Sequence, residues 1–371
     1  VGCFENFRIT AVQEDQPNMV QEFFGEAGSP QYKSWLQARR DQIPPAEAAG
    51  QILPAETAGE AGSDLNVLYL VLDSTSSAKF KQLFWQLDAA LGQLEEEKLA
   101  ETFSFDRTSV FGQNTEPNAE PMANDYTPAG GETFNNLFDT FQDAGFVPSV
   151  MEDYCPDHGF CNFFKAGPHK VCSDLLCNYK EDITDLFFKN PVPGCIHGRY
   201  WATSHTDYIT SFWKTYPQKR KFHVASVFGG HTASFAGVTA QDPVYAKLLL
   251  NMFRSGMFSR TIVAVVADHG YHHAYHQYFN SFIQGEYQHR NPVMKLVIPS
   301  HLSGLVKRTA AKANQNRLVT HLDMRYTLLK AVGVTDIAKL STSSDGRNRV
   351  AYDLLGETIP MDRTCRDARL P

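Results

Sequence analysis

The chain has 371 residues, of which 43% are hydrophobic, so it can bury a large core. Its formal net charge of -7 gives no basic field to attract phosphate backbones, which argues against a nucleic-acid partner. The longest apolar runs, at 67–72 and 262–267, fall far short of the roughly 20 residues that cross a bilayer, so we find no membrane span. Because the chain opens at Val1 without Met or a signal peptide, we expect it to be a processed or trimmed piece.

The first part of the chain divides into two segments that precede the predicted main domain. Residues 1–43 are mixed in composition and carry aromatic side chains, whereas residues 44–64 are rich in Ala, Glu, Gly and Pro. The second segment has too little apolar surface to fold alone, so we interpret it as a linker or a wrapping arm. Residues 65–371 are predicted to form one α/β domain with a Cys-rich excursion at 150–200.

Strand-like apolar runs alternate with helical patterns through this domain. The predicted strands are 66–72, 221–228, 261–267 and 293–298, and the predicted helices are 78–99, 132–144, 242–256 and 321–332. Strands interleaved with helices of this length predict a mostly parallel central sheet with helices on both faces. In such a sheet, ligands bind at the carboxyl ends of the strands.

Two of these strands end on residues that can bind a metal ion. Asp73 directly follows the strand 66–72, and Asp268 and His269 directly follow the strand 261–267. Both ends are expected at the same sheet edge, so the three side chains could share one cation. The alternative is a structural role, in which an Asp caps a helix and the His is satisfied by a hydrogen bond.

Three further residues are candidates for the same site. Thr115 lies in the Pro- and Asn-bearing segment 110–118, which we predict to be a turn. A hydroxyl raised on a turn beside a cation can lose its proton and attack, although Thr115 taken alone would be an ordinary loop residue. His231 follows the strand that ends at Phe228, and His289 precedes the strand 293–298, so both are expected near this sheet edge. Mixed Asp and His ligands suit zinc or a similar divalent metal.

The cysteines indicate disulfides in an oxidising compartment. Five of the seven crowd into one stretch, and Cys3 and Cys365 lie near the two ends. The five are Cys155, Cys161, Cys172, Cys177 and Cys195. Their spacing fits no zinc pattern, and we predict at least two disulfides there, with connectivity left open and reduced cytosolic cysteines as the alternative.

Two other features could contact a ligand. The histidines His272, His273 and His276 follow Gly270 in a Tyr-rich stretch, where they could bind metal or substrate or could form a polar loop. Arg290 could pair with an anionic ester oxygen or could form a structural salt bridge.

Five motifs, taken in their order, resemble the alkaline-phosphatase superfamily and, within it, a sulfatase-like family of eukaryotic extracellular or membrane-anchored proteins. The motifs are Val71–Ser76, Gln113–Asn118, Gly194–Arg199, Val266–Gly270 and Ile359–Pro371. The resemblance implies one metal ion held by Asp73, Thr115, Asp268 and His269, with Thr115 as the nucleophile. It also implies a second ion held by His231 and His289.

The chain departs from this family pattern at the second ion. The superfamily has an acidic residue a few positions before the histidine that corresponds to His231, whereas this chain has Ser226 and no carboxylate there. We therefore expect one tight metal site and a second that is weak or absent, since anionic ligands offset the charge of an ion. The chain also lacks the Cys-x-Pro-x-Arg element of sulfatases, which disfavours ordinary sulfatase chemistry.

The sequence thus predicts a metal-dependent hydrolase of phosphate-type esters, less readily of sulfate esters, with Thr115 as its nucleophile. The alternative is a non-catalytic extracellular module that retains the fold for assembly or recognition. The expected partners are correspondingly an anionic ester substrate or an extracellular protein, and the expected location is extracellular, in the secretory pathway or at the cell surface.

Overall fold

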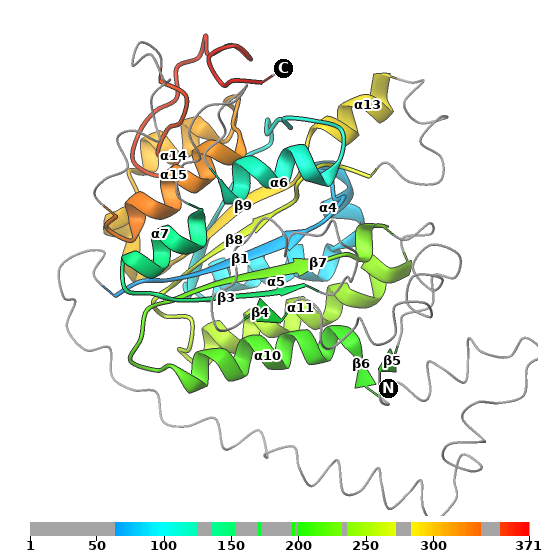
Figure 1. The fold of residues 1–371 in the computed structure, drawn as a ribbon, viewed down its shortest axis with the longest axis vertical. Helices are drawn as coiled ribbons and strands as arrows, with labels where there is room; N and C mark the ends of the chain where they lie inside the picture. The colour runs from blue at the N-terminus through cyan, green and yellow to red at the C-terminus, as the bar shows by residue number, and fades with distance from the viewer. Residues whose placement is uncertain are drawn as a thin grey trace, which may run out of the picture.

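A seven-stranded sheet with the strand order β2-β9-β8-β1-β7-β3-β4 forms the centre of the computed structural model (Figure 1). The structure describes residues 64–124, 136–152, 170–171, 195–196, 199–231, 236–271, 283–334 and 349–370. The strands are β1 (Asn66–Leu72), β2 (Ala100–Ser104), β3 (Val147–Glu152), β4 (Lys170–Val171), β7 (Lys221–Val227), β8 (Thr261–Val266) and β9 (Met294–Pro299). Among the described strands of this sheet, every pairing is parallel except the two that β9 makes, which confirms the predicted mostly parallel sheet. A separate two-stranded sheet contains β5 (Cys195–Ile196) and β6 (Arg199–Tyr200).

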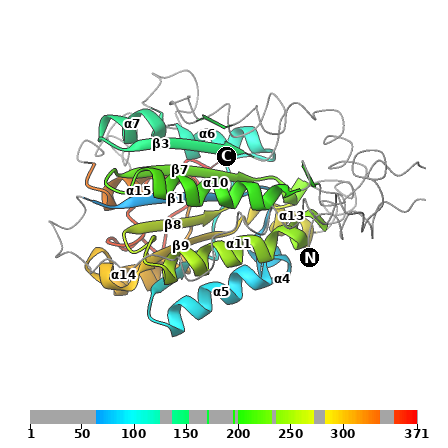
Figure 2. The ribbon, with the colours of Figure 1, turned by 90° about the horizontal axis from the view of Figure 1, so that it is seen from below.

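Helices pack on both faces of this sheet, as predicted (Figures 1 and 2). One face carries α6 (Thr115–Ala123), α7 (Leu137–Asp143), α14 (Arg308–Asn314) and α15 (His321–Ala331). The other carries α4 (Ser77–Leu83), α5 (Trp85–Glu96), α10 (Trp201–Thr215) and α11 (Ala236–Arg254). The remaining elements are α13 (Ile283–Arg290) and the 3-10 helices η3 (Gly229–His231) and η4 (Ser300–Leu305).

Strand β1 shows why the sheet is buried on both sides. Val67 and Tyr69 face the core under α6 and α15, whereas Leu68 and Leu70 face the core under α5 and α11. Each of these side chains is at most 1% exposed, and burial of one such apolar side chain contributes about 1.5–3 kcal/mol. A central parallel strand therefore has a continuous apolar sequence rather than an alternating one.

The helix predicted over 78–99 is instead two helices, because the chain bends at Phe84. The backbone of Phe84 leaves helical geometry, with φ −103° and ψ 42°. The carboxylate of Asp242, on α11, accepts the N–H groups of Gln86 and Leu87 at 2.9 and 2.8 Å. This carboxylate caps the first turn of α5 from a distant part of the chain, so the interruption is a tertiary feature.

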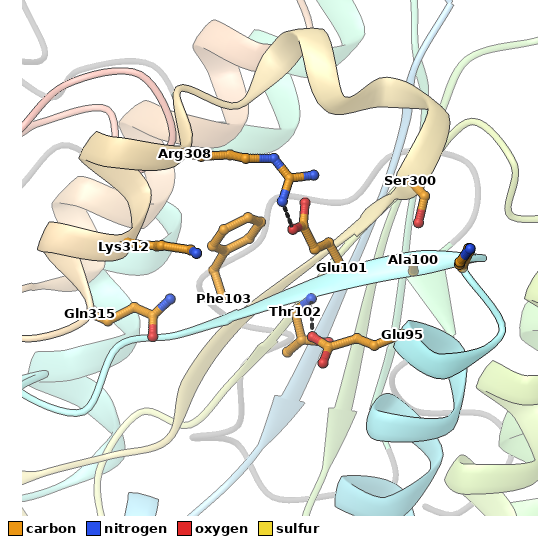
Figure 3. Close-up of a pocket in the computed structure, with 10 residues that line it drawn as sticks. Glu95, Ala100, Glu101, Thr102, Phe103, Ser300, Arg308, Lys312 and Gln315 are labelled. Carbon is orange, nitrogen blue, oxygen red and sulfur yellow. Dashed lines mark hydrogen bonds and ion pairs between the residues drawn. The ribbon is translucent and has the colours of Figure 1, made fainter.

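Strand β2 forms one edge of the sheet and was not predicted from the sequence. A groove of about 510 Å³ crosses its outer side, between α5 and α14 (Figure 3). The carboxylate of Glu95 accepts the N–H of Thr102 at 2.7 Å, and Arg308 forms an ion pair with Glu101. These contacts occupy polar groups that an exposed edge strand would otherwise offer to another chain. The groove contains none of the predicted site residues.

Several predictions concern residues outside the described part of the chain. These include the segments 1–43 and 44–63, most of the Cys-rich excursion, and the three histidines His272, His273 and His276. Cys365 is described and exposed, and it forms no disulfide with another described cysteine. The described residues contain no helix that is both long and apolar enough to cross a membrane.

Candidate metal centre and nucleophile

Three of the predicted ligands meet at the carboxyl edge of the sheet. Asp73 follows β1, and Asp268 and His269 follow β8, its hydrogen-bonded neighbour. One ligand atom from each residue lies within 4.8 Å of the other two, and all three residues are fully buried. The parallel pairing of β1 with β8 produces this convergence, because it brings both strand ends to the same place.

Thr115 lies beside one of these residues, His269. Its Oγ1 is 3.3 Å from Nε2 of His269, and the residue is 9% exposed. The prediction of a turn at this position was wrong, because Thr115 is the first residue of α6. The first N–H groups of a helix have no partner within the helix, so this position combines a hydroxyl with donors for an anion.

Asn118 fixes the loop that delivers Thr115. Its Oδ1 accepts the N–H groups of Phe111 and Gly112 at 2.7 and 3.1 Å. Its Nδ2 donates to the carbonyl oxygens of Gly112 and Asn114 at 3.0 and 2.7 Å. Asn118 is fully buried, so these four hydrogen bonds hold the approach to α6 in one conformation. Asn118 lies within the motif Gln113–Asn118, but no local signal in the sequence indicates this role.

Ser74 joins the two carboxylates. Its backbone N–H donates to Oδ1 of Asp268 at 3.1 Å, and its hydroxyl donates to Oδ1 of Asp73 at 2.9 Å. Its φ of 57° is in the left-handed region, which is unfavourable for a residue with a Cβ and typical of functional sites. Nearby, a Cβ on Gly230 would lie 2.0 Å from the carbonyl oxygen of Asp73, so only glycine allows η3 to approach this closely.

The hydrogen bond of Nδ1 determines the tautomer of His269. Nδ1 lies 2.7 Å from the carbonyl oxygen of Gly270, which can only accept, so the neutral ring carries its proton on Nδ1. Nε2 then presents a lone pair toward Asp268 and Thr115, at 3.2 and 3.3 Å. An imidazole oriented by a backbone carbonyl in this way is arranged as a metal ligand.

The charges of the site match a divalent cation. Burial raises the pKa of Asp73 well above its ordinary value, and the charge of Asp268 raises it further. No donor among the described residues makes a hydrogen bond to Oδ2 of Asp268, even though Nε2 of His269 is 3.2 Å away. Two buried carboxylates and an imidazole lone pair therefore face one another, and a cation such as zinc would satisfy all three.

The predicted second pair of ligands is only partly described. His289 is 2% exposed and lies at the end of α13. Its Nε2 donates to the carbonyl oxygen of Gln113 at 2.7 Å, and its ring centroid is 5.5 Å from that of His269. His231 ends η3 directly after β7, but its side chain lies outside the described residues. Arg290 is described and exposed on α13.

A carboxylate does lie beside Ser226, although the local sequence contains none. Ser226 is on β7, and its hydroxyl donates to Oε1 of Glu152, which ends the adjacent strand β3, at 3.3 Å. Both residues are buried, at 0% and 3% exposure. Only the pairing of β3 with β7 brings them together, so sequence reasoning could not find this acidic group.

Comparison with solved structures identifies the fold. The chain resembles the C-terminal periplasmic domain of EcEptC from Escherichia coli, with 12% identity, a TM-score of 0.50, and coverage of 74% of this chain and 84% of that one. It resembles the C-terminal periplasmic domain of phosphoethanolamine transferase EptC from Campylobacter jejuni, with 14% identity, a TM-score of 0.50, and coverage of 80% and 96%. A protein in the alkaline phosphatase superfamily from Vibrio parahaemolyticus matches with 16% identity, a TM-score of 0.48, and coverage of 85% and 78%. These likenesses show the fold alone, and the two periplasmic domains, each at a TM-score of 0.50, share the α/β fold of this chain.

The family follows from the sequence. Residues 14–371 match the sulfatase-like family described as "Protein of unknown function (DUF229)", and the chain belongs to this family. No curated protein sequence matches the chain.

Proposed function

We propose that the protein is a metal-dependent hydrolase of phosphate-type esters in which Thr115 is the nucleophile. Asp73, Thr115, Asp268 and His269 would hold one divalent cation, which we propose to be zinc. The observation that carries this proposal is the position of the Thr115 hydroxyl, 3.3 Å from Nε2 of His269. His269 in turn has a ligand atom within 4.8 Å of a ligand atom of each of the buried carboxylates of Asp73 and Asp268. Sulfate esters are a less favoured substrate, since the chain lacks the sulfatase element Cys-x-Pro-x-Arg.

The reaction proceeds by attack of the Thr115 oxygen on phosphorus. A bound cation supplies positive charge that favours the ionised hydroxyl and offsets charge on the ester. Thr115 gives its proton to solvent water, its oxygen forms a bond to phosphorus, and the bond from phosphorus to the leaving oxygen breaks. The leaving oxygen keeps the electron pair and takes a proton from solvent water to become an alcohol. Water then attacks the phosphothreonine, which releases phosphate and restores the Thr115 hydroxyl.

The amino end of α6 supports the negative charge of the ester. Thr115 and Glu116 are its first two residues, and their backbone N–H groups precede the first intrahelical hydrogen bond. The side chain of Asn114, at the N-cap, makes no capping hydrogen bond that would compete for these groups. Such donors, together with the helix dipole, favour an anion at this position.

The proposal includes a weak second cation and an extracellular location. His289 already donates from Nε2 to Gln113, so that nitrogen is not available as a ligand in this conformation. We therefore expect a second ion at His231 and His289 to bind weakly or not at all. The location in the secretory pathway, at the cell surface or outside the cell rests on the crowded cysteines.

The test compares Thr115→Ala with Thr115→Ser. Hydrolysis of p-nitrophenyl phosphate by the wild type should be low and should increase when zinc or manganese is added. Thr115→Ala should abolish the metal-stimulated part, whereas Thr115→Ser should retain some of it because it keeps a hydroxyl. Full metal-stimulated activity in Thr115→Ala would reject the nucleophile. A metal-loaded wild type that is inactive on phosphate monoesters and diesters would favour the non-catalytic module.

A further inference from the structure

A buried histidine that no motif of the sequence indicates lies next to the candidate metal centre. His321 is the first residue of α15, is fully buried, and has its ring beside the backbone of Ala267 and Asp268. Neither of its ring nitrogens makes a hydrogen bond of good geometry with any described residue. A buried polar ring without such bonds destabilises a fold, and it calls for an explanation that packing does not give.

The ring is held in place by the helix that carries it. Thr320 and Asp323 form a capping box at the start of α15, and Arg363 forms an ion pair of 2.8 Å with Asp323. A histidine ring has at least one N–H donor. That of His321 lies on a rigid support beside the peptide groups that lead into Asp268.

We propose that His321 is a positioning residue that holds Asp268 and His269 in the arrangement that a bound cation requires. Its N–H would restrain the backbone carbonyl groups at Ala267 and Asp268, and these peptide groups determine where the Asp268 carboxylate points. Hydrogen bonds that orient metal ligands in this way typically change metal affinity by about 10–100-fold. The inference deepens the proposed function and rests on its cation site.

The test is the zinc affinity of His321→Leu and His321→Gln, measured by competition with a chromophoric chelator. His321→Leu has a similar volume but no donor, so it should bind zinc about 10–100-fold more weakly than the wild type. Its metal-free form should still unfold in one cooperative transition, so that a lower affinity reports the lost donor and not a loss of the fold. His321→Gln keeps an N–H donor and should retain most of the affinity. If His321→Leu does not fold, His321→Met makes the same comparison.

His223→Leu is the matched control. His223 is also fully buried with both ring nitrogens lacking a hydrogen bond of good geometry to described residues, but it lies on β7 and faces the core under α10. Its substitution should leave zinc affinity unchanged. Unchanged affinity in His321→Leu, or an equal loss in His321→Gln or His223→Leu, would overturn the inference.

The outcomes for the wild type separate this inference from the proposed function. If the wild type binds no zinc, both are overturned. If it binds zinc with the expected dependence on His321, but Thr115→Ala keeps full activity, only the proposed nucleophile is rejected. If it binds zinc without that dependence, only the inference is rejected.

Discussion

Asn118→Ala should destabilise the protein and disable the site, because one side chain holds the loop before Thr115. The substitution removes two hydrogen bonds accepted from Phe111 and Gly112 and two donated to Gly112 and Asn114. Each is worth about 0.5–1.5 kcal/mol net, and a buried backbone group left without a partner costs about 1–3 kcal/mol. Because water can enter and the loop can relax, we expect a loss of about 2–4 kcal/mol in the free energy of unfolding.

Urea unfolding of the metal-free protein measures this loss, and hydrolysis of p-nitrophenyl phosphate measures the effect on the site. Asn114→Ala is the control for stability, because that side chain is exposed and makes no capping hydrogen bond. It should change the free energy of unfolding by at most about 0.5 kcal/mol. If Asn118→Ala changed stability no more than this control and kept full activity, Asn118 would not position Thr115.

Three further predictions concern the rest of the fold. Arg363→Met should lower the free energy of unfolding by about 3–5 kcal/mol, because it leaves the buried carboxylate of Asp323 without its cation; a loss below 1 kcal/mol in urea unfolding would contradict this. Burial lowers the pKa of His205 to about 4, whereas in the unfolded chain the pKa of a histidine is near 6.5. Between these pH values the unfolded chain binds a proton that the folded chain does not bind, so the free energy of unfolding decreases as the pH falls from 6.5 to 4. The stability difference between the wild type and His205→Gln should therefore shift against the wild type over this range, and a difference independent of pH would refute the assignment. Glu95→Ala exposes the N–H of Thr102 on the edge strand β2, so light scattering should show faster aggregation than in the wild type, and equal rates would show that the edge is protected by other means.

The central strands could be predicted because each is a short apolar run. Residues 66–72 and 261–266 are buried on both faces, so their sequences carry the signal directly. The sequence Ala100–Ser104 has no such signal, because β2 is an edge strand with partly exposed polar residues. The break between α4 and α5 was missed since the carboxylate that caps α5 comes from Asp242, more than 150 residues away.

The residues of the candidate site also divide into those that could be predicted from the sequence and those that could not. Asp73 and Asp268 could be selected because each stands at the end of an apolar strand, where the fold class itself places ligands. Ser74 and His321 could not, since their importance depends on a left-handed backbone in one case and on the packing of a distant helix in the other. The sequence can therefore indicate the chemical groups of this site, but not the residues that orient them.

The most direct test of the metal centre is the zinc content of purified protein after zinc loading and dialysis, measured by inductively coupled plasma mass spectrometry. The wild type should retain one equivalent per chain, and Asp268→Asn should retain none, because it loses one of the two buried carboxylates that meet at the site. The protein with Asp242→Asn should retain one equivalent, since that carboxylate caps α5 instead. A wild type without bound metal, or an Asp268→Asn variant that keeps a full equivalent, would contradict the assignment.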